Sequence, residues 1–69
     1  MNIKDFIKLE LKSGDLIWII NEKGEGYPGS FEGSFDLSKQ TFKFRNHSNG
    51  KLQIIEIYKL QLLVINQRV

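Results

Sequence analysis

The chain has 69 residues, with ten Lys or Arg against eight Asp or Glu and no cysteine. Its length predicts a single domain, residues 1–69, and its composition excludes disulfides and thiolate metal sites. The lone histidine, His47, cannot form a conventional zinc site, so no metal or other cofactor is expected. A core of this size supplies only about 3–5 kcal/mol of folding stability, so we expect oligomerisation to stabilise the chain further.

The charges are divided unevenly along the chain. Residues 1–38 hold four Lys against seven Asp or Glu, a net charge of −3. Residues 39–69 hold four Lys and two Arg against Glu56 alone, a net charge of +5. Such a division can produce a basic surface that attracts polyanions, although small proteins also show uneven charge by chance.

The first half of the sequence predicts one helix and two strands. Asn2–Leu11 carries apolar residues at helical spacing, with Asn2 as the N-cap, and Ser13–Asp15 ends the helix. Leu16–Asn21 predicts the first strand. Tyr27–Phe35 predicts a second strand, in which the glycines favour the sharp bend that a small barrel requires.

The second half predicts three more strands. Thr41–Arg45 is expected to direct aromatic side chains to one face and Lys43 and Arg45 to the other. An Asn-Gly turn then leads to Leu52–Tyr58, and a tight turn leads to Leu62–Ile65. One short helix followed by five antiparallel strands predicts a mainly β fold, a strongly bent small barrel.

The last two predicted strands are unusually apolar. Ten of the fourteen residues from Leu52 to Ile65 are apolar, whereas a strand with one wet face should alternate. Long apolar edges aggregate unless they are covered, and a second copy pairing edge to edge would cover them. Head-to-tail pairing of this kind closes into a ring when the rotation allows it. We therefore expect a homo-oligomer, with Trp18 in the core or at the seam between subunits.

A glycine-punctuated motif extends over the second predicted strand. Its spacing resembles the first motif of the Sm and Sm-like (LSm) protein family, with the final Phe-Asp pair one residue late. The matching positions are Gly24, Tyr27, Gly29, Phe31, Phe35 and Asp36. The resemblance covers nearly the whole chain and implies a ring of about five to seven subunits, joined by the fourth and fifth strands of neighbours.

A second segment, Ile57–Lys59, resembles the start of the last motif of the bacterial host-factor branch (Hfq), with Leu60 in place of its histidine. The Arg-Gly pair of archaeal and eukaryotic Sm proteins is absent. The chain thus resembles a divergent bacterial or phage member of the family. This resemblance implies binding of single-stranded RNA, often uridine-rich, by two loops near the pore.

The first of these loops is Asp36–Thr41. By the resemblance, Gln40 or Thr41 takes the position that reads a base, and Lys39 or Gln40 the position that normally stacks on one. A glutamine amide offers a donor and an acceptor to a base edge, but neither stacking candidate has an aromatic ring. Asp36 is expected to orient the loop through hydrogen bonds to backbone.

The second loop contains Tyr58 and Lys59, with Gln61 as a further candidate. Tyrosine can stack on a base, and lysine can bind a phosphate. Tyr58 can equally be a packing residue at the seam and Lys59 a solvated surface residue. Lys43 and Arg45 can likewise line a basic track or form an ordinary wet face.

No serine–histidine pair, carboxylate pair or phosphate loop has a catalytic spacing, so no enzyme is expected. The predicted function is a ring that binds single-stranded RNA in the cytoplasm, because neither a signal peptide nor a membrane span is recognisable. One alternative is a protein-interaction barrel similar to the Src-homology type, with Tyr27, Phe35 and Tyr58 along a peptide groove. Another is a ring scaffold that has lost RNA binding and serves a protein partner.

Overall fold

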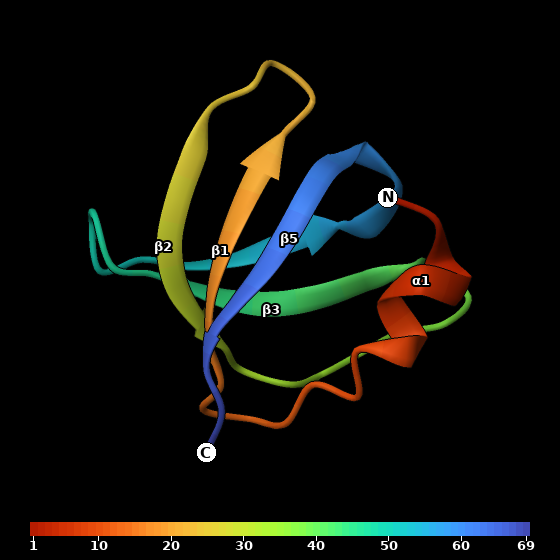
Figure 1. Cartoon of the computed structure of the whole chain (residues 1–69), viewed down its shortest axis with the longest axis horizontal. Coiled ribbons are helices and arrows are strands. Elements are labelled where there is room, and N and C mark those ends of the chain that lie inside the picture. Colours follow the sequence, from red (N-terminus) through yellow and green to blue (C-terminus); the bar gives the residue numbers. More distant parts are fainter.

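The computed structural model describes Met1–Val69 and contains one short helix and a five-stranded antiparallel sheet (Figure 1). The mainly β fold with a short N-terminal helix is therefore confirmed. The elements in chain order are α1 (Ile3–Lys8), β1 (Leu16–Asn21), β2 (Gly26–Phe31), β3 (Thr41–Asn46), β4 (Leu52–Glu56), the 3₁₀ turn η1 (Ile57–Lys59) and β5 (Leu60–Gln67).

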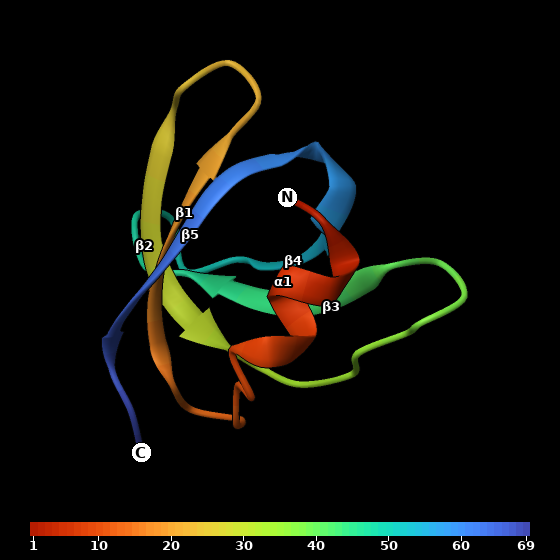
Figure 2. The same ribbon diagram turned by 45° about the vertical axis from the view of Figure 1, so that its right-hand side comes forward.

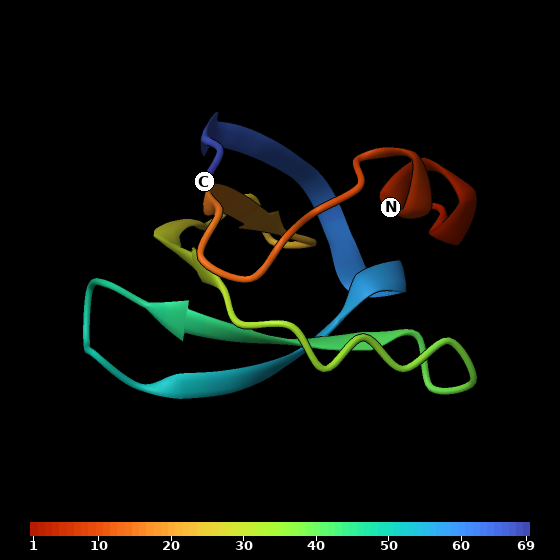
Figure 3. The ribbon, with the colours of Figure 1, turned by 90° about the horizontal axis from the view of Figure 1, so that it is seen from below.

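The sheet has the strand order β4-β3-β2-β1-β5, and all neighbouring strands are antiparallel. It bends so strongly that the β3–β4 hairpin forms one layer and β1 and β5 lie over it (Figure 3). The predicted barrel is nevertheless not closed. η1 connects β4 to β5, but β5 pairs with β1 and not with β4. β4 and β5 are therefore both edge strands.

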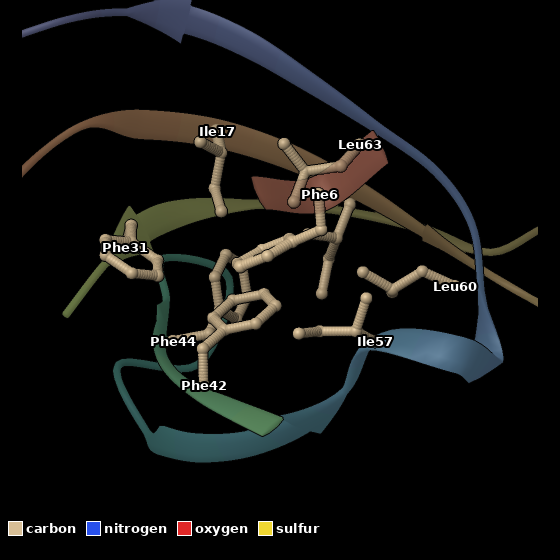
Figure 4. Packing of buried hydrophobic residues seen from close by; sticks show 9 residues of the cluster. Phe6, Ile17, Phe31, Phe42, Phe44, Ile57, Leu60 and Leu63 are labelled. Carbon is tan, nitrogen blue, oxygen red and sulfur yellow. The ribbon is translucent and has the colours of Figure 1, made fainter. Parts of the chain in front are cut away.

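The core lies between the two layers and is closed at one end by α1, which lies beside the start of β3 (Figures 1 and 2). Phe6 of α1 reaches toward Phe42 of β3, and their ring centroids are 5.2 Å apart (Figure 4). Phe42 and Phe44 are buried while Lys43 is exposed, which confirms the predicted two faces of β3. The nine buried apolar residues are Phe6, Ile17, Ile19, Phe31, Phe42, Phe44, Ile57, Leu60 and Leu63.

The N-terminal elements differ from prediction in the end of the helix and in Trp18, which does not lie in the core. Asn2 caps α1 as expected, since its side chain accepts a hydrogen bond from the Lys4 amide (2.7 Å). The helix ends at Lys8 and not at Leu11, because Glu10 adopts a φ of +50° and turns the chain away. β1 has its predicted bounds, but Trp18 points away from the core and is 38% exposed.

The later strand boundaries were predicted less well. β2 ends at Phe31 and not at Phe35, because Gly33 and Ser34 adopt φ values of +81° and +54°. β3 runs one residue further than predicted. β4 ends at Glu56 and not at Tyr58, because the next three residues form η1. β5 is longer than predicted, since it pairs with β1 from Leu60 onward.

Asp15, directly before β1, is a buried carboxylate that ties the C-terminal residues to the loop after α1. It accepts hydrogen bonds from the backbone amides of Lys12 (2.8 Å) and Val69 (2.9 Å), and Arg68 Nη1 lies 3.8 Å away. Arg68 also donates to the carbonyl of Leu9 (2.7 Å). The hydrogen bond from Lys12, followed by that from Val69, holds the pKa of Asp15 below its ordinary value.

We expect Asp15→Asn to destabilise the fold at neutral pH, and the difference from wild type to shrink in acid. A carboxyl whose pKa falls on folding stabilises the folded state above its unfolded pKa of about 4. That contribution is lost as the pH falls through the lower folded pKa. Urea midpoints measured from about pH 7 down to about pH 2 should therefore converge. Asp5→Asn, on the exposed side of α1, is the control, and a gap that stays constant over this range would refute the assignment.

Candidate nucleic-acid interface

The two predicted RNA-binding loops lie side by side at one end of the β3–β4 hairpin. Thr41, the first residue of β3, is directly opposite Glu56, the last residue of β4. The Ile57 amide donates a hydrogen bond to the Gln40 carbonyl (2.9 Å). The loop 36–41 and η1, which are far apart in the sequence, thus form one continuous surface.

Asp36 holds the first loop together. Its backbone exchanges two hydrogen bonds with Thr41 (2.9 and 3.1 Å), which close the loop. Its Oδ1 accepts hydrogen bonds from the Ser38 hydroxyl (2.7 Å) and the Lys39 amide (3.0 Å). The Lys39 amide and then the Ser38 hydroxyl lower the pKa of Asp36, so the carboxylate stays ionised in this structural role.

Gln40 stands at the end of the loop in a left-handed conformation, with a φ of +55°. This conformation is unusual for a residue other than glycine, asparagine or aspartate. Its carbonyl accepts the hydrogen bond from the Ile57 amide, while its half-exposed side-chain amide makes no hydrogen bond within the chain. The amide is therefore available to a ligand. In Figure 2 the loop that contains Gln40, drawn in lime green, projects beyond α1.

An open pocket of about 200 Å³ lies beside this loop, where β3 begins. Two lysines line it, and neither Lys39 nor Lys43 forms an ion pair within the chain. Both ammonium groups are thus available to an anion. Lys43 lines this pocket, whereas the sequence placed it only on a possible basic track. The full lining is Ser34, Asp36, Lys39, Thr41, Phe42, Lys43 and Ile54.

The second loop is organised by Glu56, which sequence reasoning missed. Its carboxylate accepts a hydrogen bond from the Tyr58 hydroxyl (2.5 Å) and pairs with the Lys59 ammonium (3.2 Å). The Tyr58 hydrogen bond and then the Lys59 contact lower the pKa of Glu56. The hydrogen bond to Glu56 in turn raises the pKa of Tyr58 and of Lys59. Glu56 precedes Lys59 by three residues, a spacing at which opposite charges meet in a helical turn, so the pair could have been found only if η1 had been predicted as such a turn.

The largest pocket, of about 350 Å³, lies between β4 and the ends of β1 and β2, where the sheet fails to close. Glu56 and Lys59 are its only charged lining residues, and most of its other polar residues carry side-chain amides. Gln61 lines neither this pocket nor the one beside Lys39. It sits at an irregularity of β5, because Ile20 pairs with Leu62 and Asn21 with Leu60.

The three aromatic residues of the peptide-groove alternative do not come together. Tyr27 lines the large pocket, whereas Phe35 lines a separate pocket of about 140 Å³ beside α1. Tyr58 lines neither and is 56% exposed. The cause is the end of β2 at Phe31, which places Phe35 against Phe6, with ring centroids 5.3 Å apart.

No group of three or more His, Asp or Glu side chains is arranged to hold a metal ion. The only α-helix falls well short of the length and apolar character needed to cross a membrane. Comparisons of the chain with protein-family models, with curated proteins and with solved structures find no match. The Sm-like resemblance therefore stays a prediction, and the function is inferred from the site itself.

Proposed function

We propose that this protein binds single-stranded RNA as a homo-oligomeric, Sm-like ring and catalyses no reaction. RNA binding is supported chiefly by one observation: Lys39 and Lys43 line the same pocket, and neither forms an ion pair within the chain. Lysine binds phosphate as a point charge, so this pair suits the backbone of a nucleic acid. The free amide of Gln40 lies on the same loop and can contact a base edge.

Assembly is supported by the two free edges of the sheet. The edge strands expose apolar side chains that a lone chain leaves in water: Leu52 (47%), Ile54 (69%), Leu62 (47%) and Val64 (42%). Pairing of β4 in one copy with β5 in the next would cover them and satisfy the unpaired backbone groups. A ring of about five to seven copies would hold several weak nucleotide sites at high effective concentration. The cytoplasm is the expected compartment.

The double variant Lys39→Ala/Lys43→Ala tests the RNA site. We expect weaker binding of fluorescent oligo-U and oligo-A, and a plot of log K against log salt that is flatter by about 0.7 for each lost phosphate contact. Anisotropy titrations between about 50 and 200 mM salt measure both. Lys51→Ala, which removes one positive charge from the opposite end of the β3–β4 hairpin, should change little. If the double variant kept the wild-type salt slope, neither lysine would contact RNA phosphate.

A second candidate function is an assembly scaffold that binds a protein partner in place of RNA. It is favoured by the absence of an aromatic residue between Leu37 and Gln40 and by the pairing of Lys59 with Glu56. Leu37 is 60% exposed on the same loop, where it would suit an apolar contact. A ring that binds neither oligonucleotide at about 50 mM salt would support this candidate.

A further inference from the structure

We infer that Glu56 is a built-in competitor for RNA phosphate, and that it sets the affinity of the interface by occupying Tyr58 and Lys59. This inference rests on the proposed function. Each carboxylate oxygen is committed to one of the two groups: Oε1 to the Lys59 ammonium (3.2 Å) and Oε2 to the Tyr58 hydroxyl (2.5 Å). A phosphate would use the same two donors, because it too is an anion with only acceptor oxygens.

The position of Glu56 is fixed by backbone contacts, so its carboxylate cannot leave the neighbourhood of η1. The residue pairs with Thr41 across the β3–β4 ladder, and the amide of the next residue, Ile57, is bonded to the Gln40 carbonyl. The carboxylate makes no cap hydrogen bond to the backbone of η1. Its contacts are therefore with the Tyr58 and Lys59 side chains, which a nucleic acid would otherwise use, and not with the backbone of η1.

The interface consequently has an open half and an occupied half. Lys39 and Lys43 are free, whereas Lys59 is paired. The charge of Glu22, in the turn after β1, adds to that of Glu56 in raising the pKa of Lys59. The side chains of Lys59 and Glu56 are 50% and 42% exposed, and ion pairs of this kind are weak enough for a ligand to displace. Glu56 thus attenuates binding without preventing it.

Glu56→Gln keeps the shape of the side chain and removes its charge. We expect single-stranded RNA to bind about two- to five-fold more tightly, the range set by typical exposed ion pairs. The plot of log K against log salt should steepen by about 0.7 for each Lys59 that gains a phosphate. Glu10→Gln, an equal charge change at the end of the helix region, is the control for net charge. Circular dichroism melts establish that each variant is folded.

The same substitution made in a Tyr58→Phe/Lys59→Ala background separates this mechanism from general repulsion. If Glu56 acts through Tyr58 and Lys59, Glu56→Gln should increase the affinity no more in that background than Glu10→Gln does. An equal gain in both backgrounds, or no gain in either, would overturn the inference while leaving RNA binding intact. If wild type and Glu56→Gln both fail to bind RNA at low salt, the proposed function and the inference fall together.

Discussion

Phe42→Ala should cost about 3–5 kcal/mol of unfolding free energy, because it empties the centre of the core. Phe42 is 0% exposed and packs on Phe6 of α1 and Phe31 of β2, with ring centroids 5.2 and 5.4 Å away. A chain of 69 residues has only about 3–10 kcal/mol of total stability. The loss would therefore leave much of the protein unfolded at physiological temperature.

Urea unfolding followed by circular dichroism measures this loss. Phe35→Ala is the matched control, since Phe35 also contacts Phe6 but is 40% exposed. It removes the same atoms from a site that water already reaches, so its loss should be clearly smaller. A loss below about 1 kcal/mol for Phe42→Ala would show that the aromatic cluster is not the centre of the fold.

Gly29→Ala should be the most damaging addition of a single methyl group, with an expected loss of about 1–3 kcal/mol or more. A Cβ at Gly29 would lie 2.1 Å from the backbone oxygen of Arg45 and 2.4 Å from the Phe44 ring. The oxygen belongs to the neighbouring strand, so β2 and β3 would have to separate at the point where they pair. Neither contact can be relieved by turning an exposed side chain.

Gly26→Ala in the same strand is the control for Gly29→Ala. Its Cβ would meet the indole of Trp18 at 2.6 Å, but that side chain lies on the surface and can move aside. Thermal melts should therefore rank the two variants clearly, with Gly29→Ala melting lower. If Gly26→Ala proved equally destabilising, close approach of β2 and β3 could not be the reason for glycine at position 29.

The bounds of β1 were predictable because its apolar run is bordered by turn residues on both sides. The end of β2 was not, because Gly33 and Phe35 continue its alternation although the chain has already turned at Gly33 and Ser34. A tight turn was predicted between Tyr58 and Leu62, but its actual position at Ile57–Lys59 was not. Ile57 and Tyr58 continue the apolar excess of β4, and no glycine or proline marks the turn.

The candidate site was predicted in part. Asp36, Lys39, Gln40 and Thr41 form one loop, and the register of β3 and β4 brings that loop to Tyr58 and Lys59. Lys43 and Glu56 gained their importance only from the structure, since Lys43 lines the pocket beside the first loop and Glu56 contacts Tyr58 and Lys59 within η1. Cross-strand partners cannot be identified until the strand ends are known, and those ends were the least accurate predictions.

Sedimentation velocity of wild-type protein with fluorescent oligo-U tests assembly and RNA binding together. At about 50 mM salt the RNA should sediment with a particle of about 40–56 kDa, which corresponds to five to seven chains of 8.0 kDa. At higher salt the RNA should be released while the particle persists, because phosphate contacts are screened and apolar edges are not. RNA that sediments alone at low salt, or a protein that sediments as a single chain, would contradict the proposed RNA-binding ring.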